Sequence, residues 1–414
     1  MDFKPYQDEL QIINRIHKFN NSEYTMIRLT KTMIDKNIID ANAFVRDLLS
    51  KYSLVDYTQL QWGGQNKIKL TGNLILNNES IKINMSFYRA NTRGDERFAI
   101  YGINKLIKNR YLNIDDLIYI TVNTKKSEPT ITLINVTHNL PKDEILSKEF
   151  GHDALEDALN RLIPVASSIA RQGFHPNLKG IGKIAPKDAG DTFEALLDIK
   201  TNNSKKADFE DLIELKSKTS KTLNTLFTLR PHFENTPIAD FESNDRNRVS
   251  AFARLYGYDS EKHPGYKSLY ITIGSENAPQ NKQGFYLFVN EDERTIELKR
   301  IENNKSIVTA FWTFDELKKE LYEKHPATLW VKVESRMNGN LAEFKYTEAE
   351  LTRSPQFMTF ISLIKTGSIT YDWRGYTTPE GKYSGKNHGN AWRIKTKQRQ
   401  LLFGSTEKID LLSL

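Results

Sequence analysis

The chain has 414 residues, a formal net charge of +7 at pH 7 and a sequence pI of about 9.1, a balance that suits a polyanionic partner such as a nucleic acid. It contains no cysteine, which excludes disulfides, thiolate metal sites and cysteine nucleophiles and is compatible with a reducing compartment. The first twenty residues mix charged and apolar side chains, so we expect neither a signal peptide nor a membrane anchor and predict a cytoplasmic protein.

The length predicts two or three domains, each large enough for its own core. A β-rich region closes at 138–143, and a helical pattern of apolar residues starts around His152 and Asp153. We therefore expect a short connection near 138–152, with one domain over 1–150 and a second over 151–414. Both are predicted to mix helices with strands.

The amino-terminal domain reads as strand-dominated. The pattern predicts one helix over 41–51 and strands at 25–30, 67–70, 74–76, 81–88, 97–101, 117–122 and 130–136. Several short strands with one or two helices favour a barrel-like sheet.

The most distinctive segment of this domain is 86–102, which carries a basic loop between two strands. It resembles the strand-loop-strand of the B3-like pseudobarrel found in the amino-terminal effector domain of EcoRII. That resemblance implies two arms that grip the DNA major groove, where Arg reads guanine and Asn reads adenine. One arm would use Arg89, Asn91, Arg93 and Arg97, and the opposing arm Arg28, Lys31, Lys36 and Asn37. The alternative is an ordinary solvated hairpin.

The segment 207–216 carries a carboxylate six residues ahead of a Glu-x-Lys motif. Because side chains alternate along a strand, Glu214 and Lys216 should project together while Ile213 and Leu215 enter an apolar layer. Asp208 would arrive from the preceding turn and converge with Glu214 on Mg²⁺, which prefers oxygen ligands. The alternative is a solvated strand face with an i, i+2 ion pair.

This arrangement resembles the PD-(D/E)xK nucleases. Together, the blocks 173–218 and 371–394 are similar to the MvaI/BcnI restriction endonucleases, relatives of the mismatch-repair nickase MutH. Over 151–414 the resemblance implies a MutH-like fold, a mixed sheet flanked by helices. It makes Asp208 and Glu214 metal ligands and Lys216 the catalytic lysine. Glu194 would add a ligand or hold a water at the metal; its alternative is a helix-surface glutamate near a helix N-terminus.

The second block holds further candidates. His388 lies in a Gly-rich basic loop with Lys386, ahead of a strand that presents Arg393, and we expect it to contact the scissile phosphate. Its alternative is a hydrogen-bonding surface histidine. Asp372 and Arg374 share a strand face, so an acid accepting from cytosine N4 beside an arginine donating to guanine would read a C·G pair.

Between the blocks the pattern predicts scaffold. Strands are expected at 223–229, 268–274, 285–289, 295–300 and 328–334, and capping boxes predict helices after Thr313 and Thr347. Trp312, Phe314 and Trp330 are predicted core residues.

The resemblance implies a type II restriction endonuclease that depends on Mg²⁺ and acts on double-stranded DNA, with a DNA site in each of the two domains. One catalytic centre per chain implies a monomer that nicks the strands in turn. The expected target is CCWGG, W being A or T, with CCSGG or CCNGG as alternatives. Two other functions stay open, a MutH-like nickase and a catalytically silent DNA-binding protein.

Overall fold

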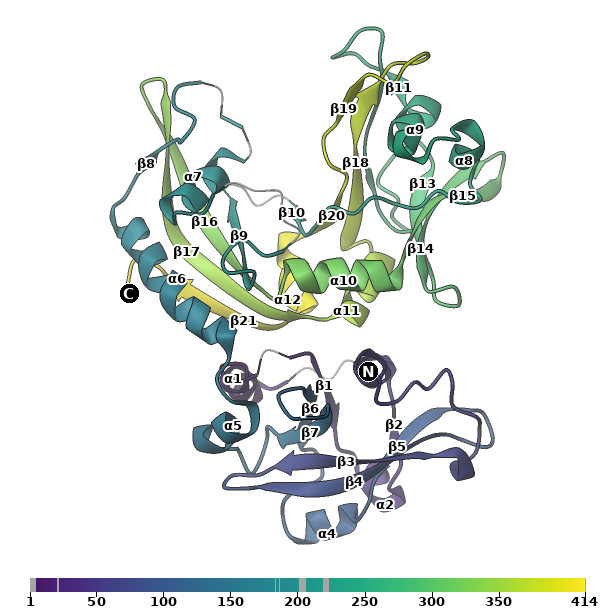
Figure 1. Ribbon diagram of the computed structural model, residues 1–414, viewed down its shortest axis with the longest axis vertical. Helices are drawn as coiled ribbons and strands as arrows, with labels where there is room; N and C mark the ends of the chain where they lie inside the picture. Colours follow the sequence, from purple (N-terminus) through teal and green to yellow (C-terminus); the bar gives the residue numbers. More distant parts are fainter. Residues whose placement is uncertain are drawn as a thin grey trace.

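The computed structural model is a mixed α and β fold, and it describes residues 5–20, 22–182, 184–185, 187–200, 206–218 and 223–413. The amino-terminal part, purple to blue in Figure 1, lies below a larger carboxy-terminal part whose two lobes stand side by side. Among the described residues no helix is long and apolar enough to cross a membrane.

A seven-stranded sheet forms the amino-terminal part, in the order β1-β6-β7-β3-β4-β5-β2. Its strands are β1 (Tyr24–Arg28), β2 (Ile39–Asp40), β3 (Ile68–Ile75), β4 (Ser80–Arg89), β5 (Glu96–Ile100), β6 (Leu117–Asn123) and β7 (Thr130–Asn135). The helices are α1 (Gln7–Ile16), α2 (Lys31–Lys36), α3 (Ala43–Lys51), α4 (Ile103–Lys108) and α5 (Asp143–Phe150), with a short 3₁₀ turn η1 (Gly64–Asn66). The predicted strands and the helix over 41–51 are confirmed.

Two details differ from the sequence-based expectations. The segments 67–70 and 74–76 belong to one strand, β3, because Ile68 to Ile75 pair without a break with β4. Gly72 continues this strand beside β7, where a Cβ would lie 2.7 Å from Ile131 O. The expected short connection at 138–152 contains α5, whose Leu146 and Phe150 are buried in the amino-terminal core.

The first carboxy-terminal lobe, on the left in Figure 1, is built on a sheet in the order β21-β17-β16-β9, with β8 paired to β17. Its strands are β8 (His175–Pro176), β9 (Ile213–Lys218), β16 (Ala327–Asn338), β17 (Leu341–Pro355) and β21 (Phe403–Asp410). The helices α6 (Ala154–Arg171) and α7 (Asp188–Leu196) pack on this sheet, and β9 runs parallel to β16.

The second lobe contains a sheet in the order β10-β20-β18-β12-β11, with β19 paired to β18, and a three-stranded sheet β13-β14-β15. Its strands are β10 (Asn224–Thr225), β11 (Tyr258–Asp259), β12 (Lys267–Ile273), β13 (Phe285–Asn290), β14 (Thr295–Glu302), β15 (Lys305–Thr313), β18 (Ile369–Thr377), β19 (Gly385–Asn387) and β20 (Ala391–Ile394). Its helices are α8 (Pro237–Phe241), η2 (Asp245–Asn247), α9 (Arg248–Tyr256), α10 (Phe314–Lys324), α11 (Phe357–Lys365), η3 (Thr396–Gln398) and α12 (Arg399–Leu402).

The capping box at Thr313 and Glu316 begins α10, as predicted, and Trp312, Phe314 and Trp330 are buried core residues, also as predicted. The helix predicted after Thr347 is wrong. That segment belongs to β17, which pairs with β16 on one side and β21 on the other, and these sheet contacts outweigh a local capping signal.

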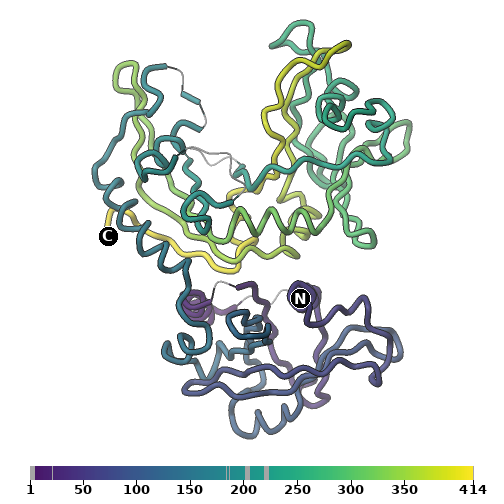
Figure 2. Tube along the Cα trace, viewed as in Figure 1, coloured from purple at the N-terminus to yellow at the C-terminus, as the bar shows by residue number. Residues whose placement is uncertain are grey.

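The buried cores divide at the same place in the chain. Each of the four apolar clusters lies wholly before residue 151 or wholly after it. Polar contacts join the two parts: the Tyr24 hydroxyl donates to Gly404 O at 2.5 Å, and Lys318 Nζ lies 2.8 Å from Asp47 Oδ1. The trace in Figure 2 shows the chain passing from the lower part into α6 of the upper part at a single crossing.

Candidate active site

Strand β9 places Glu214 and Lys216 on one face. Ile213 and Leu215 point into the opposite apolar layer, with exposed fractions of 0% and 4%. The Lys216 ammonium contacts Glu214 Oε1, and the Glu214 side chain is fully buried. The predicted alternation along this strand is confirmed, and the ion pair exists, but a fully buried carboxylate does not fit a solvated strand face.

A tight turn brings Asp208 back to the same strand. Glu210 and Asp211 have positive φ angles of 53° and 60°, and this backbone reversal lets Asp208 Oδ2 accept a hydrogen bond from Leu215 N at 2.9 Å. Glu210 pairs with Arg161, so it points away from this site. The structure therefore brings Asp208 and Glu214 together, as expected.

Sequence reasoning missed a second lysine. Lys324, the last residue of α10, lies 2.9 Å from Glu214 Oε2 and 3.5 Å from Asp208 Oδ1 through its Nζ atom. Burial alone would lower the pKa of Lys324, but Glu214 and Asp208 outweigh it and the pKa is raised. It lies far along the chain from β9 and in no motif, so no spacing signal pointed to it.

Glu194 on α7 faces the same group. Burial, and then repulsion from Asp208 and Asp191, raises the pKa of Glu194 to about 7. The pKa of Asp208 is also raised, by burial and then by Glu214. Because α7 begins at Asp188, Glu194 lies in its last turn, and the alternative of a surface glutamate near a helix N-terminus is wrong. Crowded carboxylates of this kind favour a bound cation.

The donor set fits Mg²⁺ in chemistry. Asp208, whose side chain is 20% exposed, and the buried Glu214 offer carboxylate oxygens close to each other, and Mg²⁺ prefers a few such ligands completed by water. Within the part of the chain that the structure describes, no group of three or more acidic or imidazole side chains is arranged as a ready-made metal cage.

Of these residues, Lys216 lines a basic cleft between the two lobes, which has a volume of about 1400 Å³. It contains acidic as well as basic side chains, and the basic ones are Lys187, Lys216, Lys218, Lys332, Arg374, Arg393, Arg399 and Lys408. Burial, followed by repulsion from Arg393 and Arg399, lowers the pKa of Lys218 to about 8. A polyanion passing through the cleft would relieve this repulsion and meet Lys216 on its way.

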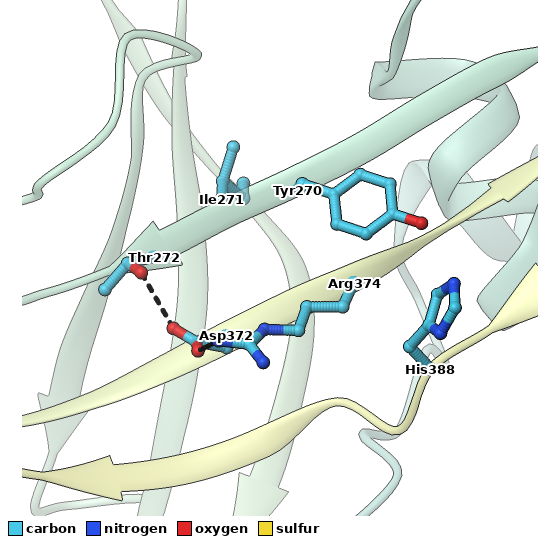
Figure 3. A pocket seen from close by; sticks show the side chains of 6 residues that line it. All are labelled: Tyr270, Ile271, Thr272, Asp372, Arg374 and His388. Atoms are coloured by element: carbon cyan, nitrogen blue, oxygen red, sulfur yellow. Dashed lines mark hydrogen bonds and ion pairs between the residues drawn. The ribbon is translucent and has the colours of Figure 1, made fainter. Parts of the chain in front are cut away.

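A second pocket of about 430 Å³ is lined by residues of β12 and β18 and by His388, which follows β19 (Figure 3). Asp372 is buried at its floor, with an exposed fraction of 1%. Its carboxylate accepts a hydrogen bond from Thr272 at 2.8 Å, lies 2.7 Å from Arg393 Nε and contacts Arg374. The expectation that Asp372 accepts a bond from cytosine does not fit the closed position of this side chain, which is only 2% exposed and is surrounded by Thr272, Arg374 and Arg393.

Arg374 fits base contact better. Its side chain is 40% exposed and lines both the pocket and the cleft, and Asp372 fixes its guanidinium. Lys386 is exposed on β19, and Arg393 is only 16% exposed. His388 lines the same pocket, its ring 5.9 Å from that of Tyr270 (Figure 3), so the structure places it beside Arg374; its expected contact with the scissile phosphate stays a prediction.

The comparisons with known proteins match this geometry. The family model of the MvaI/BcnI restriction endonuclease family matches residues 165–403, which include the carboxylates of β9 and the pocket on β18. The chain belongs to this family.

A solved structure described as restriction endonuclease MvaI in complex with cognate DNA is similar at 23% sequence identity and a TM-score of 0.51. The match covers 61% of this chain and 98% of the MvaI chain, so it shows that the carboxy-terminal part has the MvaI fold. MvaI in the absence of DNA matches at 21% identity over the same shares, with a TM-score of 0.37. No curated protein sequence matches the chain.

The amino-terminal candidates lie outside the residues that the family model matches. Arg28 does not fit the predicted DNA contact: it is buried, pairs with Glu9 at 2.7 Å and donates to Asp115 O at 2.8 Å. Asn37 ends α2 in a left-handed conformation, and its side chain accepts a bond from Ile100 N at 3.3 Å. Both side chains therefore make structural contacts within the amino-terminal domain of this family member.

The other candidates gather at one edge of the sheet, because β2 pairs with β5 and brings the two predicted arms side by side. Lys31, Lys36, Asn91 and Arg93 are exposed, whereas Arg89 and Arg97 are partly buried. Arg97 pairs with Asp95 at 3.0 Å. Sequence reasoning missed Trp62, which is 51% exposed and lies against the same basic loop, 5.6 Å from the Arg89 guanidinium.

Proposed function

We propose that this protein is a Mg²⁺-dependent type II restriction endonuclease with a second DNA-binding domain in front of its nuclease domain. Membership of the MvaI/BcnI family establishes the restriction endonuclease class. The observation that supports the chemistry is the convergence of Asp208, Glu214 and Lys216, the last of which lines a basic cleft.

In this proposal Asp208 and Glu214 hold Mg²⁺, which when bound supplies positive charge at the scissile phosphate and acidifies a water molecule. Lys216 orients the attacking water and stabilises negative charge as the phosphorus is attacked in line. Glu194, which faces the same group from α7, would add a ligand or hold a water at the metal. The products are 5′-phosphate and 3′-hydroxyl ends.

We assign base reading to Arg374, with Lys386, Arg393 and His388 beside it on the same sheet face. Arg374 donates to guanine O6 and N7 in the major groove, and Asp372 fixes the arginine instead of contacting the base. The target proposed is CCWGG, with CCSGG or CCNGG as alternatives for the central pair. Since one chain carries one centre, a monomer nicks the two strands in turn.

The decisive experiment incubates the protein with plasmids in Mg²⁺ and sequences the ends. We expect a nicked intermediate followed by a linear product, with every end at CCWGG. Persistent nicking without linear product would favour a MutH-like nickase instead. Specific binding without any cut would favour a silent DNA-binding protein.

We also propose that the amino-terminal domain is a B3-like effector that binds the same target. A short cognate duplex added in trans should accelerate cutting of a single-site plasmid by about fivefold or more, the lower range of ordinary allosteric coupling. The full-length double variant Asn91→Ala, Arg93→Ala should lose that acceleration, because both exposed side chains belong to the proposed reading loop.

The control is Lys142→Ala, which removes an exposed cation next to α5, away from β2 and β5 (Figure 1). It should respond to the duplex as the unchanged protein does. Equal acceleration in the double variant would rule out this loop as the effector site. Failure of residues 1–150 to prefer cognate over scrambled duplex would remove the B3-like interpretation.

A further inference from the structure

Helix α10 contacts the amino-terminal domain on one side and the candidate active site on the other. Lys318 pairs with Asp47 of α3 at 2.8 Å, and the Tyr322 hydroxyl donates to Glu23. Lys51 of α3 lies 2.8 Å from Glu23 and 4.2 Å above the Tyr322 ring. These contacts are partly or fully buried, so they fix the helix against the front domain.

Lys324 leaves the opposite side of the same helix. At roughly 100° per residue, Lys324 lies about 200° around the axis from Tyr322. Its ammonium group reaches Glu214 at 2.9 Å and Asp208 at 3.5 Å. The next residue, His325, is buried and bonds Thr328 Oγ1 at 2.7 Å and Leu226 O at 2.9 Å, which anchors the end of the helix to β16 and to the segment that follows β10.

Lys324 Nζ therefore contacts Asp208 Oδ1 and Glu214 Oε2, two oxygens that could otherwise bind a metal cation. One ammonium cannot share the same carboxylate oxygens with Mg²⁺ at ligand distance, because two like charges repel there. Lys216 does not have this conflict to the same degree, since it contacts the other oxygen of Glu214.

We propose that Lys324 is a positioning residue that competes with the metal ion for Asp208 and Glu214, and that the amino-terminal domain sets the strength of this competition through α10. The inference rests on the proposed metal site at these two residues. The domain contacts at Lys318 and Tyr322 hold α10 so that Lys324 stays on the carboxylates. Loosening those contacts releases the lysine and opens the site to the metal.

Helix α3 of the amino-terminal domain, which carries Asp47 and Lys51, also contacts the proposed reading loop. Arg46, next to Asp47 on α3, lies 3.2 Å from Glu96 at the start of β5. A shift of α3 on DNA binding would therefore act on α10 through one intervening contact. Spatial continuity alone does not demonstrate coupling, so the test measures the coupling itself.

The experiment titrates Mn²⁺ into the DNA-free, full-length protein and follows free Mn²⁺ by electron paramagnetic resonance. Lys324→Met should bind Mn²⁺ about tenfold more tightly than the unchanged protein, which corresponds to about 1.4 kcal/mol. Lys324→Arg keeps the positive charge and should retain the weaker affinity. The matched control is Lys319→Met, because Lys319 is 70% exposed on the same helix and its ion-pair partner is Glu323.

The link to the front domain is tested by the double variant Asp47→Asn, Tyr322→Phe, which should also tighten Mn²⁺ binding. Combined with Lys324→Met it should add nothing further, because both changes release the same contact. Unchanged or weaker Mn²⁺ binding by Lys324→Met would overturn the competition, and fully additive effects would overturn the link through α10. Asp208→Ala and Glu214→Ala separate the two proposals: if these variants still bind Mn²⁺ as the unchanged protein does, the proposed metal site itself is wrong.

Discussion

Alanine at Asp208, Glu214 or Lys216 is expected to lower the rate of DNA cleavage by at least about a thousandfold, or about 4 kcal/mol of transition-state stabilisation. The two carboxylates supply the proposed metal ligands, and Lys216 supplies the positive charge beside them. None of the three is among the base-reading residues, so specific binding should persist. The measurement is single-turnover cleavage of a cognate duplex, with affinity measured separately in Ca²⁺.

The turn before β9 offers matched controls. Glu210 and Asp211 are acidic neighbours of Asp208, yet they pair outward with Arg161 and Lys206. Alanine at either position should leave the cleavage rate within a few fold of the starting value. Near-normal cutting by any one of the three centre variants would show that the catalytic centre lies elsewhere.

The parts of this site that sequence predicted are those fixed by local geometry. Alternation along a strand places Glu214 and Lys216 on one face whatever the rest of the fold does. The approach of Asp208 also follows from nearby residues, because the left-handed turn at Glu210 and Asp211 folds it onto Leu215. The apolar runs of the amino-terminal strands were equally local, and the structure follows them closely.

The parts that sequence could not predict depend on contacts between distant segments. Lys324 reaches the carboxylates from a helix in another part of the chain, and its own neighbours read as an ordinary amphipathic helix. The capping box at Thr347 is a true local signal, but two neighbouring strands supply its backbone with better partners. The burial of Arg28 was equally unpredictable, because it depends on an ion pair with Glu9 of α1.

Asp372 shows the same limit and changes the expectation for the base-reading group. Sequence placed Asp372 and Arg374 on one strand face, which the structure confirms, but it gave no sign that Thr272 and Arg393 would enclose the carboxylate. The enclosed carboxylate of Asp372 orients Arg374 and Arg393, and the proposed base contact is made by Arg374. Substitutions of Asp372 and of Arg374 should therefore have different effects on base discrimination and on the free energy of unfolding.

Arg374→Ala is expected to cost about 1 to 3 kcal/mol of discrimination at one G·C position, the usual value of a bidentate arginine contact. A backbone contact would instead weaken binding to all sequences alike and reduce its salt dependence. Lys382→Ala removes an exposed cation of the loop that follows β18 and serves as the control, because it should leave discrimination unchanged. The measurement is affinity for the cognate duplex and for each single-base variant.

Asp372→Ala is expected to do more, because it leaves Arg374 and Arg393 beside each other without the carboxylate that holds both. Removing one partner of a buried ion pair costs about 3 to 5 kcal/mol, and here the loss should appear in the free energy of unfolding as well as in DNA binding. Discrimination should fall at more than one base pair, since two arginines lose their orientation together. If Asp372→Ala instead relaxed only a single C·G position and left the unfolding free energy unchanged, Asp372 would contact cytosine directly after all, and its enclosure by Thr272 and Arg393 would have to open on DNA binding.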